Sequence, residues 1–191
     1  MKKVLITGHK GYIGQHLWQM IKQTRPDIEL YGMDNKGDGN EYGDVRGLMS
    51  CGTYFHTIIH LAALVRVGQS VEKPTDYYMT NLQGTINVLK NVPHHNFIFA
   101  STGAAENPNS PYGFSKWAGG EYLKTFHQDY VICTFPNVYG RNNKSVVDIF
   151  KNSDKVTIYG DGEQLRDYVH VDDIIKGLLL AKDWSIGEYR S

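Results

Sequence analysis

Short apolar runs alternate along this chain with longer segments in which apolar residues recur every three or four positions. The short runs are rich in β-branched and aromatic residues, which is typical of strands in a parallel sheet, and the longer segments have the spacing of one helix face. Five strands are predicted, over Lys3–Ile6, Glu29–Met33, Thr57–Leu61, Asn96–Ala100 and Tyr130–Thr134. Three helices are predicted between them, over Tyr12–Gln23, Tyr77–Asn91 and Tyr112–Asp129. This order predicts an α/β fold with a doubly wound parallel sheet and right-handed crossovers.

The pattern becomes less regular after about Gly140. We expect a short helix over Val146–Phe150, a strand over Lys155–Tyr159 and a final helix over Asp172–Ala181. The chain is therefore divided into a sheet domain of residues 1–140 and 167–191 and a small second lobe of residues 141–166.

The composition excludes several classes of protein. The 191 residues carry 20 Lys and Arg against 20 Asp and Glu, with no block of five like charges, so we expect neither a nucleic-acid partner nor a membrane partner. The only cysteines, Cys51 and Cys133, are not in a CxxC pair, which argues against a disulfide framework or a metal site and favours a reducing cytoplasm.

A glycine-rich turn follows the first predicted strand. Gly8, Gly11 and Gly14 are spaced so that the backbone can turn sharply and approach a pyrophosphate at the start of the first helix. Asp34 closes the second strand, where a carboxylate can bind an adenosine ribose. We interpret the pair as a dinucleotide site that favours NAD over NADP, because a carboxylate repels a 2′-phosphate. Lys36, which is close in sequence, keeps NADP as an alternative cofactor. The alternative to a dinucleotide site is an ordinary strand–helix turn with a surface aspartate.

A tyrosine and a lysine open the third predicted helix. Ser110 and Pro111 read as an N-cap and first helical position, and the i, i+4 spacing puts Tyr112 and Lys116 on one face. A nearby ammonium favours the phenolate of a tyrosine, so Tyr112 is a candidate acid/base. The alternative is ordinary packing on an amphipathic helix.

Several motifs in order resemble one family. The G-x-x-G-x-x-G spacing resembles the extended short-chain dehydrogenase/reductases, as do Gly43-Asp44-Val45-Arg46 and His60-Leu61-Ala62-Ala63. The segment from Val67 to Thr85, with Asn81, is especially similar to UDP-glucose 4-epimerases, and Ala100-Ser101-Thr102 resembles the family's strand end with a catalytic hydroxyl.

The resemblance implies a Rossmann fold, an NAD cofactor and a catalytic triad of Thr102, Tyr112 and Lys116. In the family's reaction NAD takes a hydride from sugar C4 while the tyrosine takes the 4-hydroxyl proton, and hydride returns to the opposite face of the resulting 4-keto sugar. The implied cofactor-binding residues are Gly8, Gly11, Tyr12, Ile13, Gly14, Asp34, Asn35, Asp44, Val45, Leu61, Ala62, Ala63, Asn81, Ser101, Tyr112, Lys116 and Pro136.

The later motifs resemble the family's nucleotide-sugar half. Pro136-Asn137-Val138-Tyr139-Gly140 resembles its P-N-V-Y-G, and residues 156–173 form the longest match. The resemblance implies a nucleotide-diphosphate sugar as substrate, bound by Asn137, Thr157, Tyr159 and Arg166. A solvated Arg166 paired with Asp167 is the alternative for that residue. Family members also pair through helices matching 77–91 and 112–129, so we expect a homodimer with Trp117 and Tyr122 as contact candidates.

The departures from the family pattern bear on the reaction. Gly103-Ala104 lacks the acids that family dehydratases carry after the catalytic hydroxyl, which favours an epimerase, although Glu106 is close in sequence. Thr134 replaces an arginine, and the match reaches only the first part of a family member. A dehydratase, a reductase and a catalytically silent NAD-binding protein remain alternatives, and the base and sugar are open.

Overall fold

The computed structural model describes residues 2–36, 43–47, 50–126, 129–141, 145–158, 160–181 and 187–190. Its main element is a six-stranded sheet in the order β2-β1-β3-β4-β5-β8, in which every neighbouring pair is parallel. The strands are β1 (Lys2–Thr7), β2 (Ile28–Met33), β3 (Phe55–His60), β4 (His94–Thr102), β5 (Tyr130–Phe135) and β8 (Gly187–Arg190). The prediction of a doubly wound parallel sheet is confirmed.

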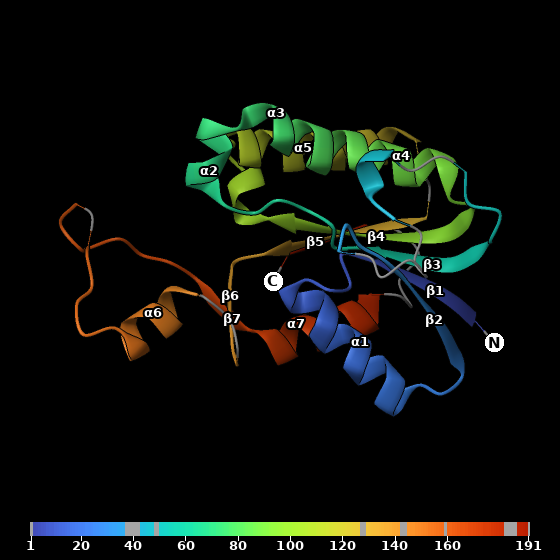
Figure 1. Ribbon diagram of the computed structural model, residues 1–191, viewed down its shortest axis with the longest axis horizontal. Coiled ribbons are helices and arrows are strands. Elements are labelled where there is room, and N and C mark those ends of the chain that lie inside the picture. Colours follow the sequence, from blue (N-terminus) through green and yellow to red (C-terminus); the bar gives the residue numbers. More distant parts are fainter. Residues whose placement is uncertain are drawn as a thin grey trace.

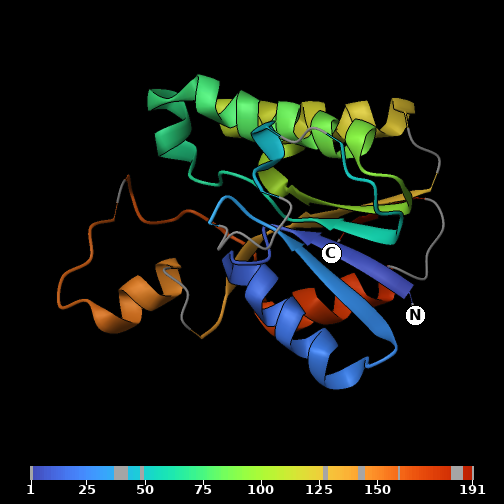
Figure 2. The ribbon, with the colours of Figure 1, turned by 45° about the vertical axis from the view of Figure 1, so that its right-hand side comes forward.

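Helices cover both faces of the sheet (Figures 1 and 2). One face carries α1 (Tyr12–Thr24) and α7 (Val171–Ala181), and the other carries α2 (Val67–Glu72), α3 (Pro74–Tyr77), α4 (Gly84–Asn91) and α5 (Pro111–Phe126). Short 3-10 turns lie at Val45–Gly47 and Gly103–Ala105. Among the described residues, no helix combines the length and apolar character that crossing a membrane requires.

The core has two layers because successive strand residues point to opposite faces. Ile6 and Ile59 pack with Leu17 of α1 and Leu178 of α7 in one cluster. Leu5, Ile58 and Phe97 pack with Val88 and Leu123 in the other. These side chains are almost fully buried, so the sheet is a rigid frame for the loops at the carboxyl ends of its strands.

The helix predicted over Tyr77–Asn91 is interrupted. It begins earlier, at Pro74, and residues Tyr78–Gln83 form a π-helix between α3 and α4. The π-helical turn surrounds Asn81, whose side chain is fully buried. Such local widening of a helix often occurs where a side chain has a specific task, and hydrophobic spacing alone does not reveal it.

The lobe extends away from the sheet domain (Figure 1). Its helix α6 (Val146–Asn152) begins with a capping box between Ser145 and Asp148 and buries no residue. The predicted strand over Lys155–Tyr159 is wrong, because residues 155–158 have no regular structure and are exposed, and Tyr159 lies outside the described residues. The alternating apolar residues of that segment have no partner strand among the described residues. Instead β6 (Asn137–Tyr139) and β7 (Tyr168–His170), which the sequence did not predict, form a separate parallel pair.

Candidate active site

The glycine-rich turn from Gly8 to Gly14 is called the phosphate loop below. It lies where the strand order reverses, between β1 and β3, which is the ligand-binding position of doubly wound sheets. Gly8 has φ +72°, and a Cβ there would lie 2.7 Å from the Ala62 backbone nitrogen. A Cβ on Gly14 would lie 2.3 Å from the Gly8 carbonyl oxygen. Both glycines are therefore required for the close packing of α1 and the Ala62 loop against this turn.

The start of α1 suits an anion. Its N-cap, Gly11, makes no side-chain capping hydrogen bond, and the first turn contains no acidic residue. The first backbone N–H groups of a helix lack intrahelical partners and carry positive potential. This cradle of glycines and helix N–H groups fits the pyrophosphate of a dinucleotide, with Tyr12, Ile13 and Gly14 supplying the N–H groups.

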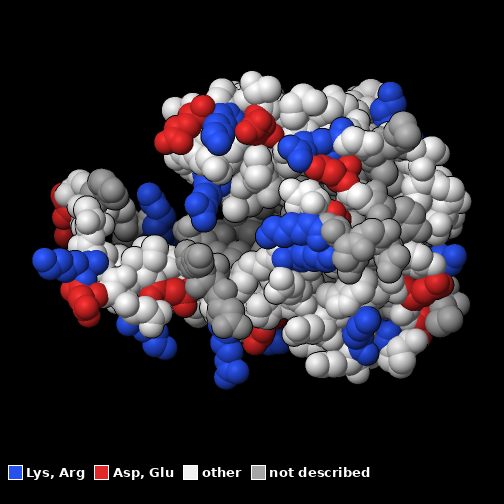
Figure 3. All heavy atoms as spheres, in the orientation of Figure 1, with Lys and Arg blue, Asp and Glu red and all other residues white. Residues whose placement is uncertain are grey.

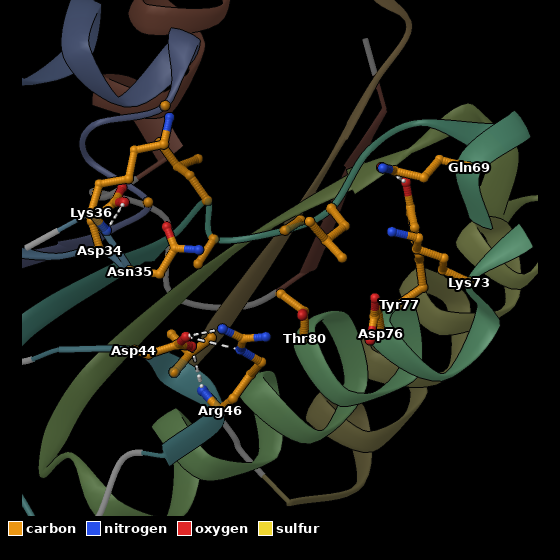
Figure 4. A pocket seen from close by; sticks show the side chains of 17 residues that line it. Asp34, Asn35, Lys36, Asp44, Arg46, Gln69, Lys73, Asp76, Tyr77 and Thr80 are labelled. Carbon is orange, nitrogen blue, oxygen red and sulfur yellow. Dashed lines mark hydrogen bonds and ion pairs between the residues drawn. The ribbon is translucent and has the colours of Figure 1, made fainter.

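A pocket of 420 Å³ opens beside the loop (Figure 4). Nine of the predicted cofactor residues line it: Gly8, Gly11, Asp34, Asn35, Asp44, Val45, Leu61, Ala62 and Ala63. Figure 3 shows this face hollowed at its centre, with Lys and Arg side chains along the rim; Lys36, Arg46 and Lys73 belong to the pocket lining. Asp34, Asp44 and Asp76 line the same pocket, so cationic and anionic side chains both face a ligand there.

Asp34 directly follows β2 at the pocket wall and is 9% exposed. Its two carboxylate oxygens accept hydrogen bonds from the backbone N–H groups of Lys10 and Lys36, each at 3.0 Å. These bonds hold the carboxylate in a fixed orientation between the phosphate loop and the strand end. It is therefore prepared to accept further hydrogen bonds, such as those from ribose hydroxyls.

Asp44 also lines the pocket and is paired with Arg46 (Figure 4). Arg46 donates from its backbone nitrogen at 2.9 Å and from its guanidinium at 2.9 and 2.5 Å. The pairing holds the pKa of the Asp44 carboxyl below its ordinary value, chiefly through the side-chain hydrogen bond. Sequence reasoning missed Arg46 as a lining residue.

The catalytic candidates come together at the end of β4 and the start of α5. Ser110 caps α5 by accepting a hydrogen bond from the Gly113 backbone at 3.2 Å, as predicted, and this places Tyr112 and Lys116 in the first two turns. The hydroxyl of Thr102, the last residue of β4, makes a side-chain hydrogen bond with Tyr112 that favours the phenolate. The three residues of the predicted triad are thus adjacent.

Burial controls the charges of this triad. Desolvation raises the pKa of Tyr112 above its ordinary value, with a smaller rise from Tyr77, and the Thr102 hydrogen bond opposes both. Desolvation also lowers the pKa of Lys116 to about 7. Burial disfavours the charged form of each group, so a further positive charge is needed to stabilise the phenolate.

A second pocket, of 160 Å³, contains the polar groups of this end of the site. Ser101, Thr102, Glu106, Lys116 and Thr134 are among its lining residues. Glu106, which follows the catalytic hydroxyl in sequence, therefore shares a surface with two of the triad residues.

Some predicted cofactor residues do not line the 420 Å³ pocket: Tyr12, Ile13, Gly14, Asn81, Ser101, Tyr112, Lys116 and Pro136. Asn81 is fully buried. Its amide accepts from the Leu64 backbone at 2.8 Å and donates to the Leu64 carbonyl and the Ser115 hydroxyl at 2.9 Å each. In this structure Asn81 holds the backbone of the loop of residues 61–64 after β3, which is called the cofactor loop below.

The sequence did not single out the far wall of the pocket. It is lined by residues of α2, α3, the π-helix and the residue between α2 and α3: Gln69, Lys73, Asp76, Tyr77 and Thr80. Tyr77 donates to the Arg66 carbonyl at 2.7 Å and contacts the Tyr112 ring edge-on at 6.3 Å between centroids. The pairing of Tyr77 with Tyr112 across two helices has no local sequence signal, because the contact depends on how the helices pack.

The predicted substrate residues lie in and near the lobe. Asn137 in β6 donates to the Asp167 carbonyl from its backbone and side chain, each at 3.1 Å, and Asp167 follows Arg166 in the chain. Arg166 is exposed and donates to the Leu165 carbonyl at 2.9 Å, and Thr157 is also exposed. The structure thus joins Asn137 to Asp167 but gives no contact between Asn137 and Arg166, and Tyr159 lies outside the described residues.

The described residues contain no group of three or more His, Cys, Asp or Glu side chains placed to hold a metal ion.

Comparisons with known proteins agree with this geometry. Residues 4–188 match the model of the NAD dependent epimerase/dehydratase family. A protein of Methanocaldococcus jannaschii named as a putative UDP-glucose 4-epimerase is 32% identical over 95% of this chain and 73% of its own length. Other matches are named as dTDP-glucose 4,6-dehydratases, including one from an Actinoplanes species that is 28% identical.

Two solved structures have the same fold over nearly the whole chain. A UDP-glucose 4-epimerase of Thermus thermophilus in complex with NAD has a TM-score of 0.82 at 28% identity, over 98% of this chain and 76% of that one. A dTDP-glucose 4,6-dehydratase of Streptomyces venezuelae with NAD and TYD bound has a TM-score of 0.82 at 26% identity, over 98% and 74%.

Proposed function

Because the chain belongs to the NAD-dependent epimerase/dehydratase family, we propose that it inverts C4 of a nucleotide-diphosphate sugar through a transient 4-keto sugar, with NAD as its cofactor. The observation that carries the proposal is that Thr102, at the end of β4, interacts with Tyr112 and lines one pocket with Lys116. The relatives named as 4-epimerases support the choice of reaction.

The cofactor proposal rests on fit. The glycine cradle, the open start of α1 and the fixed Asp34 carboxylate suit a pyrophosphate and a ribose. Asp34 disfavours a 2′-phosphate at the same place. When bound, NAD would supply hydride acceptor and donor chemistry for C4 of the sugar and the positive charge of its oxidised nicotinamide.

Tyr112 acts as the acid/base in this proposal. Its phenolate takes the proton of the sugar 4-hydroxyl as the C4 hydride leaves, and gives it back when the keto group is reduced. Thr102 donates a hydrogen bond that holds the hydroxyl and the phenolate in line. Lys116, one helical turn further on, binds the nicotinamide ribose and adds positive potential when it is protonated.

The lobe and the partner copy complete the proposal. Asn137 and Arg166 bind the diphosphate of the sugar nucleotide, where a guanidinium offers charge and a fork of donors, and residues 141–166 form the nucleotide-sugar lobe against a Rossmann domain of residues 1–140 and 167–191. The helical segments over residues 77–91, which include the π-helix and α4, and over residues 112–129, which include most of α5, form the homodimer contact, with Trp117 47% exposed.

A dehydratase is the second candidate, because one observation favours it. Glu106 lines the same small pocket as Thr102 and Lys116, and a carboxylate there can move a proton from C5 of the sugar. The Gly103-Ala104 pair, which lacks the acids of family dehydratases, favours the epimerase.

Product analysis separates these functions. The protein is incubated with NAD and, in turn, with UDP-, dTDP- and GDP-linked sugars, and the products are resolved by chromatography and NMR. We expect the C4 epimer of one of these sugars. A 4-keto-6-deoxy product identifies a dehydratase, and NAD binding without turnover of any sugar in the panel contradicts the enzyme proposal and supports a silent NAD-binding protein.

A further inference from the structure

His60 lies at the end of β3 with no exposed surface. Its Nδ1 is 2.8 Å from the Thr7 hydroxyl of β1, and its Nε2 is 3.0 Å from the Thr85 hydroxyl of α4. Both ring nitrogens therefore have hydrogen-bond partners inside the core. The imidazole connects the sheet to the helix layer that carries the catalytic candidates.

The hydrogen bonds of the neighbours fix the direction of this connection. The Thr85 hydroxyl donates its single proton to the Asn81 carbonyl at 2.6 Å, so it can only accept from His60. His60 Nε2 must then carry a proton. The Ala62 backbone N–H donates to the Thr7 hydroxyl at 3.2 Å, which leaves the Thr7 proton free to go to an unprotonated Nδ1. All donors and acceptors are satisfied by one neutral tautomer.

This chain of hydrogen bonds has an end at each part of the site. At one end is Ala62, whose nitrogen lies at the phosphate loop beside Gly8 and which lines the large pocket. At the other end is Asn81, whose side chain donates to the Ser115 hydroxyl, and Ser115 donates to the Tyr112 carbonyl at 2.8 Å. The path thus runs from the cofactor loop through the core to the catalytic helix.

The surroundings of His60 favour the neutral ring. Phe97 and Phe99 contact it with ring centroids 5.5 and 6.0 Å away. Burial, with a smaller effect of Lys116, lowers the pKa of His60 to about 3. The ring therefore keeps one proton, and one hydrogen-bond direction, across the pH range in which enzymes of this kind work.

We infer that His60 is a positioning residue that, as its Nε2-protonated neutral tautomer, ties the Ala62 cofactor loop to the π-helix at Asn81 and so to Tyr112. The effect on the cofactor loop is independent of the reaction, whereas the effect on Tyr112 rests on the function proposed above. An apolar side chain at this position would fill the core but leave the Thr7 and Thr85 hydroxyls without their common partner.

The tautomer is measured directly by ¹⁵N NMR of the histidine rings in the wild-type protein. We expect one ring whose Nε2 is protonated and whose Nδ1 is not, unchanged between pH 8 and pH 5 and absent from the spectrum of His60→Gln. A ring protonated at Nδ1, or one that becomes cationic in this range, overturns the inference.

Variants measure the positioning. His60→Leu is expected to weaken NAD binding about tenfold and to lower kcat more than it raises KM, because the loop and Tyr112 lose their shared anchor. His60→Gln, which keeps a donor and an acceptor, should restore most of both. Thr57→Val, a buried change in the same strand, is the control. If His60→Leu does not fold, Thr7→Val and Thr85→Val take its place, because each removes two hydrogen bonds of the chain, one of them to His60.

The readouts separate the two proposals. Suppose that the wild type turns over no sugar, that His60→Leu binds NAD more weakly than the wild type, and that His60→Gln binds it nearly as well. This outcome contradicts the epimerase and supports the positioning of the cofactor loop. Wild-type NAD affinity and wild-type kcat in a stably folded His60→Leu overturn the positioning role.

Discussion

The ammonium of Lys116 lies 4.0 Å from the centroid of the Phe99 ring. The lysine is 3% exposed, so the aromatic face replaces part of the hydration that the charge loses on burial. The replacement is incomplete, since burial still lowers the pKa of Lys116 to about 7. The residue is therefore held at the site at a cost in stability, which is typical of groups kept for function.

Lys116→Met should remove a pH dependence of stability. The pKa of Lys116 is about 7 in the folded protein and near its ordinary value in the unfolded chain, so between these values the unfolded chain binds a proton that the folded one does not. The free energy of unfolding then rises with pH through this window, by at most about 1.4 kcal/mol per unit. Chemical denaturation from pH 7 to 10 should show a smaller rise for the variant than for the wild type.

The control is Lys124→Met, an exposed lysine of the same helix paired with Glu121. It should leave the slope of stability against pH unchanged. Equal slopes for Lys116→Met and the wild type would show that the buried ammonium does not titrate in this window.

Asp34→Ala should weaken NAD binding and relax discrimination against NADP. The variant loses the carboxylate that is fixed by the Lys10 and Lys36 backbone, and with it the repulsion of a 2′-phosphate, while Lys36 remains in the pocket lining. Calorimetric titration with both cofactors should show that the Kd for NADP divided by the Kd for NAD falls about tenfold or more. This is the effect expected for the loss of one charge-assisted hydrogen bond. Asp27→Ala, at an exposed pair with Arg25, is the control, and an unchanged ratio in Asp34→Ala contradicts the assignment.

Gly14→Ala and Gly177→Ala should have opposite effects on stability. A Cβ at Gly14 would lie 2.3 Å from the Gly8 carbonyl oxygen, whereas a Cβ at Gly177 in α7 meets nothing within 4 Å. Alanine at 177 should stabilise the protein by about 0.5–1 kcal/mol because it restricts the unfolded chain and favours the helix. Alanine at 14 should destabilise it and weaken NAD binding, and thermal unfolding of both variants compares them. A Gly14→Ala protein as stable as the wild type would contradict the close approach.

The sequence predicted what depends on local pattern. The five strands follow from short apolar runs, and the N-cap at Ser110 follows from a serine before a proline, because both signals are contained in a few neighbouring residues. The cradle around Gly8 and Gly14 was predicted for the same reason, since glycine spacing reports backbone conformation directly.

Features that depend on packing could not be predicted in this way. The π-helix at Asn81 and the pairing of Tyr77 with Tyr112 arise from contacts between elements distant in sequence. The strand predicted over Lys155–Tyr159 was wrong because an alternating pattern forms a strand only when a partner strand is within reach. β6 and β7 have only three residues each, and they form strands because the fold brings these two segments together as partners. The sequence indicated His60 only as part of a motif. Its hydrogen bonds to Thr7 and Thr85 could be identified only in the structure.

Trp117→Glu should convert a dimer into a monomer. Trp117 and Phe114 in α5 are 47% and 44% exposed, and Met79 in the π-helix is 45% exposed. Exposed apolar side chains on one helix layer are typical of subunit contacts. Light scattering at micromolar concentration should give twice the chain mass for the wild type and the chain mass for the variant. Leu180→Glu, at an exposed residue of α7 on the opposite face of the sheet, should remain a dimer. A monomeric wild type removes the prediction.

Thr102→Val and Tyr112→Phe should separate the tuning of the proton acceptor from its presence. The Thr102 hydrogen bond lowers the pKa of Tyr112 against the effect of burial, so its loss should raise that pKa and move the rise of kcat to higher pH while some activity remains. Tyr112→Phe removes the acceptor and should lower kcat by about a hundredfold or more at every pH, with NAD affinity little changed because the ring still packs against Tyr77. Rate profiles from pH 6 to 10 and NAD titrations measure both. A Thr102→Val profile at the wild-type position would show that the hydroxyl does not tune Tyr112, and a Tyr112→Phe enzyme at the wild-type rate would assign the proton transfer to another group.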